Sequence, residues 1–277
     1  MRYIFLILFF AGCKSAEVTL KTLDENEPAN DKESVVVESP AEIAFKKSPS
    51  ATYIEKTFQV GSRTVVVADF SKGEGLIFIN LHDDENTSIE AAIDVIDRFG
   101  GKLLQLKHTG ERNLEFRIGR TRYEVDPNRI FTDRGARESL QKLGRYSEES
   151  MKEVRTFAQK LVEGINSDVI FTLHNNTDEN YSAASYLDEY KNDAEDVFIK
   201  EGNDPDDFFF VTERLFFDAL KVRGFNVVLQ NNETMTDDGS LSVLAAQRKI
   251  PYINIEAEHG HTEQQTRMLE VIYELFN

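Results

Sequence analysis

The stretch LIFINLHDDE, residues 76–85, joins a nearly continuous apolar run to a histidine and a glutamate. An apolar run that does not alternate with polar residues is typical of a β-strand covered on both faces, as in a parallel sheet between helices. The run therefore predicts a central strand at Leu76–Leu81. His82 follows directly and Glu85 comes three residues later, so the strand leads into residue types that bind metal ions.

Two further apolar runs, at residues 169–173 and 252–255, have the same character, and a helical pattern with apolar residues three and four apart runs from Met151 to Ile165. Strands that alternate with helices predict an α/β domain with a mixed, mostly parallel β-sheet flanked by helices. Other strands are expected at 53–60, 63–70, 102–106, 114–118, 122–125 and 225–229, and other helices at 87–99 (with Thr87 and Glu90 as its capping box), 208–222, 241–247 and 263–276.

Metal-binding residue types follow all three of these apolar strands. His82 and Glu85 follow the first strand, His174 the second and Glu256 the third. In open α/β sheets, ligands bind in the crevice outside the carboxyl ends of the strands. His82, Glu85 and His174 together make a His₂Glu set that leaves a fourth position for water, as in catalytic zinc sites. Any one of these histidines alone would more simply be a local hydrogen-bonding residue, so the prediction depends on the set.

The composition excludes several classes of protein. The chain has 277 residues, of which 40% are hydrophobic, enough for one large domain or two small ones. The formal net charge of −17 argues against nucleic acid as a partner, because phosphate-backbone binding needs clustered Lys and Arg. Cys13 is the single cysteine, which excludes an intrachain disulfide framework and a thiolate metal cluster.

The N-terminus is typical of a targeting segment. Residues 1–12 read MRYIFLILFFAG, with an apolar run too short to span a bilayer but suited to a secretory signal. The run leads to Phe-Ala-Gly-Cys, which resembles the lipobox of bacterial lipoproteins and implies cleavage before Cys13 and its acylation. Residues 13–50 are rich in charged residues, Ser and Pro, and predict a disordered tether between the lipid and a folded domain at 51–277. The expected location is the cell envelope, with the chain anchored to a membrane.

Four motifs in order resemble those of the zinc carboxypeptidases and the related succinylglutamate desuccinylase/aspartoacylase group. They are His82-Asp83-Asp84-Glu85, Asp126-Pro127-Asn128-Arg129, Leu173-His174 and Tyr252-Ile253-Asn254-Ile255-Glu256. The family fold, a mixed β-sheet flanked by helices, agrees with the fold class expected above. The resemblance implies one zinc ion per chain held by His82, Glu85 and His174, a substrate carboxylate gripped by Asn128 and Arg129, and Glu256 as general base. It also implies an arginine that polarises the scissile carbonyl, for which Arg112 is the candidate and Arg117, Arg120 and Arg122 are the alternatives.

The sequence departs from the family at several positions. Pro127 replaces an aliphatic residue before Asn-Arg, which alters the local backbone but spares the contacting side chains. Glu258 is an alternative base to Glu256, and His259 and His261 could contact substrate or be structural. The acidic run at 203–207 could suggest calcium but is more typical of a solvated loop before a helix, so no calcium site is expected.

The function expected from these residues is hydrolysis of an amide bond near a free carboxylate. A peptide or a peptidoglycan stem peptide is the natural substrate for an enzyme anchored in the cell envelope. The alternatives are an N-acyl amino acid deacylase of the desuccinylase type, which would use the same zinc ligands, and a non-catalytic envelope binding protein on the same fold.

Overall fold

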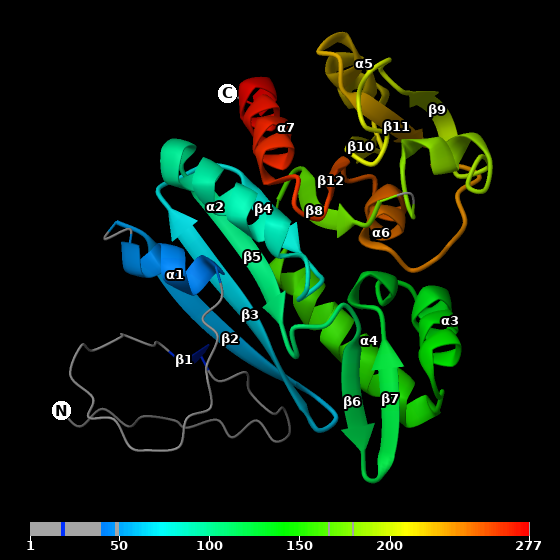
Figure 1. Cartoon of the computed structure of the whole chain (residues 1–277). Coiled ribbons are helices and arrows are strands. Elements are labelled where there is room, and N and C mark those ends of the chain that lie inside the picture. The colour runs from blue at the N-terminus through cyan, green and yellow to red at the C-terminus, as the bar shows by residue number, and fades with distance from the viewer. Residues whose placement is uncertain (1–17, 20–39, 48–49, 166, 179, 277) are drawn as a thin grey trace, which may run out of the picture.

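The computed structural model describes residues 18–19, 40–47, 50–165, 167–178 and 180–276. Within these residues a large central sheet is covered by helices on both faces (Figure 1). No helix in this part of the chain is both long and apolar enough to span a bilayer. Cys13 and the predicted signal segment 1–12 lie outside the described residues.

The large sheet is mixed, with parallel strands at its centre. From one edge to the other it contains β1 (Val18–Thr19), β2 (Thr52–Val60), β3 (Arg63–Lys72), β5 (Gly101–Lys107), β4 (Ile77–Asn80), β8 (Ile170–Asn176), β12 (Tyr252–Glu258), β10 (Phe208–Val211), β11 (Asn226–Gln230) and β9 (Ala194–Phe198). Strands β5, β4, β8 and β12 are mutually parallel, whereas the outer strands are joined mainly by antiparallel pairs. The predicted class, an α/β fold with a mixed sheet flanked by helices, is confirmed.

Each face of the sheet packs against its own set of helices and its own hydrophobic core. One core lies under α1 (Pro40–Lys47), α2 (Asn86–Phe99), α5 (Arg214–Val222) and α7 (Thr262–Phe276). The other lies under α3 (Asp133–Leu143), α4 (Glu148–Gly164), α6 (Leu241–Arg248) and the separate hairpin β6 (Leu114–Ile118) and β7 (Thr121–Val125). Figure 1 shows α1 and α2 on one side of strands β2–β5, and α4 on the other. Because β4, β8 and β12 are buried between these layers, their sequences need no polar face.

The parallel register brings the carboxyl ends of three strands together. Asn80 on β4 is aligned with Leu173 on β8, and His174 on β8 is aligned with Glu256 on β12. His82 follows β4 by two residues, so it lies at the same edge of the sheet. Strands β8 and β12 continue to residues 176 and 258, so His174 and Glu256 lie within strands and not after them.

Two local predictions are wrong. The helix expected at 208–222 is a strand, β10, followed by helix α5, because Phe208–Val211 is a buried aromatic and β-branched run that pairs with both β11 and β12. The capping box at the start of α2 does not form. Thr87 Oγ1 accepts a hydrogen bond from the backbone of Gly260, 2.9 Å away, so tertiary contact overrides the local capping pattern.

The region predicted as a tether contains one helix next to the domain. Helix α1 spans Pro40–Lys47, and its Ala41 is buried in the same core as α2. The packed part of the chain therefore begins before residue 51.

Candidate active site

Three side chains form a buried cluster at the ends of β4 and β8. The Nδ1 atom of His82 lies 2.7 Å from Glu85 Oε1 and 3.1 Å from His174 Nδ1, and His174 Nδ1 lies 3.0 Å from Glu85 Oε2. Each of the three residues is at most 4% exposed. Two imidazole nitrogens and a carboxylate that converge on one point form a group able to hold a metal ion.

The local backbone explains how residues three apart in sequence meet. After β4 the chain turns, with Glu85 N donating to His82 O and Asn86 N donating to Asp84 O. This turn places Glu85 directly before α2, beside His82. Asn80, at the end of β4, supports the carboxylate through its Nδ2, 3.4 Å from Glu85 Oε2. The strand, the turn and the helix together fix both ligand atoms.

The ring nitrogen of each histidine that faces away from the cluster has a partner of its own, which orients the ring. His82 Nε2 donates to Asp126 Oδ1 at 2.8 Å, so that once the ring is neutral the Nδ1 lone pair faces the cluster. Such a carboxylate behind a histidine is the usual support of a metal-binding imidazole. Asn128 Oδ1 accepts from Leu241 N, so the Nδ2 of Asn128 faces His174 Nε2 at 3.3 Å. The segment that contains Asp126 and Asn128, held by the first residue of α6, thus supports both histidines.

The charges of the cluster are strongly coupled. Burial lowers the pKa of His82, but Glu85 and Asp126 outweigh it and raise that pKa to about 9. Burial alone would raise the pKa of Glu85, yet His82 and His174 hold it well below its usual range. Burial lowers the pKa of His174 and favours its neutral form. Protons and a metal ion would therefore compete for the same three atoms.

Glu256 lies next to this cluster on β12 and is 4% exposed. Its Oε2 accepts a hydrogen bond from Asn254 Nδ2 at 2.9 Å. Burial, with the negative charge of Glu85, raises the pKa of Glu256 to about 8. A carboxyl group with a pKa near neutrality can both take and give a proton at physiological pH, which suits a general acid–base residue.

The predicted arginines approach from two loops. Arg112 is half exposed, and its Nη1 donates to Glu85 Oε1 at 2.8 Å. Arg129 ends the short 3₁₀ helix η1 (Pro127–Arg129), where its Nη1 donates to Asn128 O and its Nε lies 3.4 Å from Asp238 Oδ2. Pro127 occupies the first position of this helix, where no backbone N–H is needed.

Close backbone packing fixes η1. Gly239 has φ +80°, and a Cβ at this residue would lie 2.4 Å from Arg129 O and 2.6 Å from Gly135 Cα. Phe131 N donates to Gly239 O at 2.9 Å. Only glycine permits this approach, which brings Asp238 beside Arg129.

One cavity of about 620 Å³ connects these groups. The predicted residues Arg112, Asn128, Arg129, His174 and Glu256 all line it, whereas His82 and Glu85 lie buried beneath it. Of the residues left open by the sequence, His259 lines the cavity, while Glu258 and His261 do not. Glu258 is 3.5 Å from His261 Nε2, so the geometry favours Glu256 as the base.

Several residues that line the cavity have no role predicted from the sequence. Tyr181 and Tyr186 form a hydrogen-bonded pair, 2.5 Å between their hydroxyl oxygens, and burial raises the pKa of both, so they stay neutral. Asp84 also lines the cavity, and its buried Oδ1 has no hydrogen-bond partner among the described residues. No local pattern marks these residues, because they meet the site only through the tertiary fold.

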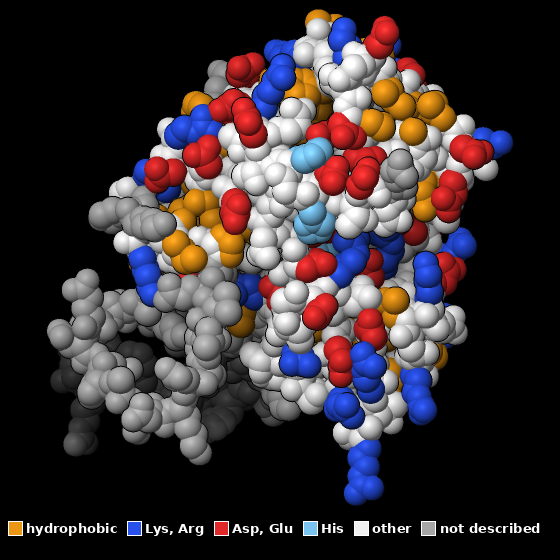
Figure 2. Space-filling model, viewed as in Figure 1, with side chains coloured by type: hydrophobic (Ala, Val, Ile, Leu, Met, Phe, Trp, Pro, Cys, Tyr) orange, Lys and Arg blue, Asp and Glu red, His pale blue; other side chains and the backbone are white. Residues whose placement is uncertain are grey.

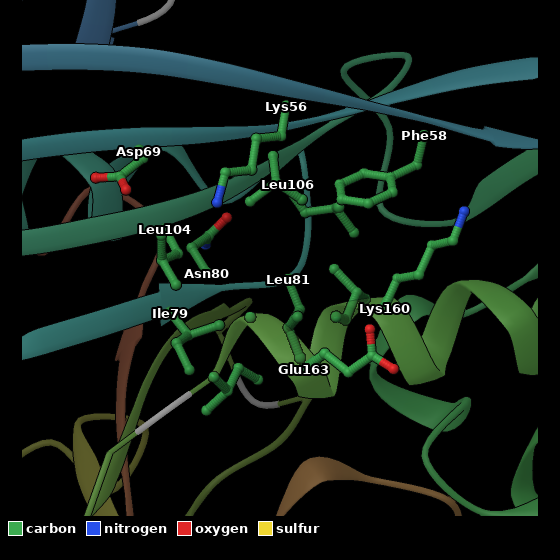
Figure 3. A pocket seen from close by; sticks show the side chains of 14 residues that line it. Lys56, Phe58, Asp69, Ile79, Asn80, Leu81, Leu104, Leu106, Lys160 and Glu163 are labelled. Atoms are coloured by element: carbon green, nitrogen blue, oxygen red, sulfur yellow. The ribbon is translucent and has the colours of Figure 1, made fainter. Parts of the chain in front are cut away.

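A smaller cavity of about 240 Å³ lies between the sheet and the end of α4 (Figure 3). Its walls are mainly apolar and come from β2, β3, β4, β5 and α4. Its lining meets the His-Glu cluster at Asn80, through the contact with Glu85, and at Leu81, the residue before His82. The larger cavity, which contains the predicted catalytic and substrate-binding side chains, is therefore the candidate active site.

No protein-family model and no curated protein matches the sequence. Among solved structures, the chain is similar to a protein from Shewanella baltica provisionally assigned as a metallopeptidase (16% identity, 77% of this chain and 81% of that one, TM-score 0.40). It is also similar to thrombin activatable fibrinolysis inhibitor (11%, 84% and 70%, TM-score 0.44) and to the murein-tripeptide amidase MpaA from Escherichia coli O157 (13%, 81% and 90%, TM-score 0.38). These likenesses are too weak to assign an activity, so the site is interpreted from its own geometry.

Proposed function

We propose that this protein is a zinc-dependent hydrolase that cleaves an amide bond near a free carboxylate, in a peptide or a peptidoglycan stem peptide. The observation that carries the proposal is the convergence of His82 Nδ1, His174 Nδ1 and Glu85 within hydrogen-bonding distance of one another beneath a cavity that also contains Glu256 and Arg129. A metal ligand set, a proton-transfer group and an anion-binding group are the parts that such a reaction needs.

The ligand set suits zinc. Two neutral imidazoles and one carboxylate are the ligands of many catalytic zinc sites, and Asp126 supplies the outer carboxylate. When bound, zinc would supply Lewis-acid chemistry, acidifying water and polarising the amide carbonyl.

The remaining roles belong to the side chains of the cavity. Glu256 takes a proton from the attacking water and returns it to the leaving amine nitrogen, so its carboxyl group is the base first and the acid later. Arg112 is close enough to the cluster to stabilise negative charge that develops on the carbonyl oxygen. Asn128 and Arg129 bind the substrate carboxylate, since a guanidinium forks onto two carboxylate oxygens.

The test is an assay of matched substrates that differ only at the C-terminus. Peptides with a free carboxylate should be hydrolysed about a hundredfold faster than their C-terminal amides, because only the free acid engages Arg129. A chelator should abolish the activity, and added zinc should restore it. Equal hydrolysis of both substrates would contradict the proposed role of the carboxylate. N-acyl amino acids in the same assay would distinguish a deacylase from a peptidase.

We also propose that acylated Cys13 anchors the protein to a membrane of the cell envelope. The support is the sequence Phe-Ala-Gly-Cys at the end of a short apolar run. Replacing Cys13 by serine should move the protein from the membrane fraction to the soluble fraction. A Cys13→Ser protein that remains in the membrane fraction would contradict the anchor.

A further inference from the structure

Three carboxylates form a second cluster beyond the active-site residues, where β8, β12 and the turn before β10 meet. Asp178, Asp206 and Glu258 each offer an oxygen, and these atoms all lie within 4.8 Å of one another. Asp206 is 4% exposed, and Glu258 is half-buried. Figure 2 shows acidic side chains gathered beside a histidine on this face of the molecule. Carboxylates this close repel one another, and a cation bound between them would relieve that repulsion.

A buried amide oxygen provides independent support for a cation. Asn176 is 6% exposed, and its Oδ1 is buried without a hydrogen-bond partner among the described residues. Buried polar atoms are nearly always hydrogen-bonded, so an orphaned carbonyl oxygen indicates a missing ligand. The backbone hydrogen bonds of β8 satisfy the main chain of Asn176, but they provide no donor for its side-chain oxygen.

The position of Asn176 directs its amide into the acidic cluster. It is the register partner of Glu258 across the parallel pair β8–β12, so the two side chains lie on the same face of the sheet. Its Nδ2 donates to the backbone oxygen of Asp206 at 2.7 Å, and Asp178 follows two residues later in the chain. Asn176 is therefore linked to each of the three carboxylate residues, through the sheet register, a backbone hydrogen bond or the chain itself.

We propose that Asp178, Asp206, Glu258 and the Oδ1 of Asn176 form a calcium site. Four oxygen ligands, three of them charged and one an amide carbonyl, suit a hard cation. Calcium accepts irregular arrangements of carboxylates and carbonyls from separate segments, whereas magnesium requires near-octahedral geometry. The acidic run at 203–207, which the sequence alone makes a solvated loop, then contributes Asp206 as a ligand.

A cation at this site would stabilise one wall of the active-site cavity. It would join the ends of β8 and β12, the two strands that carry His174 and Glu256 two residues earlier. The segment that follows Asn176 supplies Thr177, Asn180 and Tyr181 to the cavity lining. The site shares no ligand with the His82, Glu85 and His174 cluster, so calcium binding does not depend on the proposed hydrolase function.

The test is a calcium titration of the full chain, monitored by calorimetry and by thermal unfolding. The protein is first freed of metals with a chelator and then reloaded with zinc. One calcium ion per chain should bind and raise Tm by several degrees. Asp178→Asn, which removes one charge from an exposed ligand, should weaken calcium binding about tenfold or more. Glu201→Gln, which removes one charge from an exposed residue outside the cluster, should leave the calcium affinity unchanged. The His82→Ala, His174→Ala double variant should still bind one calcium ion.

Three results would overturn the proposal. The first is an absence of heat and of any change in Tm up to about 10 mM calcium, a concentration above the weakest extracellular calcium sites. The second is an unchanged calcium affinity in Asp178→Asn. The third is binding of zinc in place of calcium that is lost in His261→Ala, which would assign the cation to the neighbouring group of Asp204, Glu258 and His261.

Discussion

Glu256→Gln should lower kcat by about 10²–10⁴-fold, the range that a positioned general acid–base residue contributes. Glutamine keeps the size of the side chain and can still accept the hydrogen bond from Asn254, 2.9 Å away in the structure. It cannot take a proton from water. The variant should therefore stay folded and bind zinc as tightly as the protein without the substitution. The loss of kcat would then be confined to the chemical step. Steady-state kinetics and metal analysis on the same preparation measure both quantities.

The pH profile separates this role from a structural one. Glu256 must be deprotonated to act as a base, so activity should rise with pH on the acid side of its pKa. Burial and the charge of Glu85 raise that pKa to about 8, and a bound cation would lower it from there. The acid limb of the profile should disappear in Glu256→Gln. The matched control Glu201→Gln, at an exposed position, should keep both the rate and the profile. A Glu256→Gln variant that retains more than about a tenth of the activity would place the base elsewhere.

Arg129→Ala should reduce kcat/KM for substrates with a free carboxylate by about a hundredfold or more, because it removes the half-buried charged partner of that group. The same substitution should change hydrolysis of the C-terminal amide far less, since the amide carries no charge for Arg129 to bind. Arg129→Lys should recover part of the loss, because lysine restores the charge but not the forked geometry.

The comparison of the two substrates matters because Arg129 also has a structural contact. Its Nε lies 3.4 Å from Asp238 Oδ2, in the loop that packs against η1. If the variant only disturbed this loop, hydrolysis of the acid and of the amide would fall together, which would contradict the binding role. Arg134→Ala, which removes an exposed ion pair with Glu138, serves as the control and should change neither rate.

The sequence predicts best those strands that are fully buried, because a run of consecutive apolar residues is enough to identify them. Strands β4, β8 and β12 each begin with a mainly apolar run because both of their faces are covered, and the parallel register then aligns their more polar carboxyl ends. The hairpin β2–β3 is equally predictable, because Gly61 separates two segments rich in β-branched and aromatic residues. Gly61 adopts φ +54° in the structure, as a tight turn requires. From these strands the positions of His82, His174 and Glu256 at one edge of the sheet follow directly.

The missed elements depend on contacts distant in sequence. Helix α3 (Asp133–Leu143) has only a narrow buried stripe, and Gly135 within it is needed for the close approach to Gly239. Asp238, the neighbour of Arg129, and Tyr181 come from loops, and Tyr186 from the short 3₁₀ helix η2 (Ala183–Leu187). No periodic pattern in the sequence positions these residues. From the sequence alone, strand β10 is indistinguishable from the start of a helix, because four consecutive apolar residues are compatible with either structure until the sheet partners are known.

The central claim is that His82, Glu85 and His174 hold one zinc ion, and the most direct test is the metal content of the purified protein. We expect about one zinc per chain, and none in the His82→Ala, His174→Ala double variant, because one carboxylate cannot hold the ion alone. If the protein without substitutions contains no metal and binds none when zinc is supplied, the cluster is only a hydrogen-bonded network of two imidazoles and a carboxylate. That result would contradict both the metal centre and the proposed hydrolase.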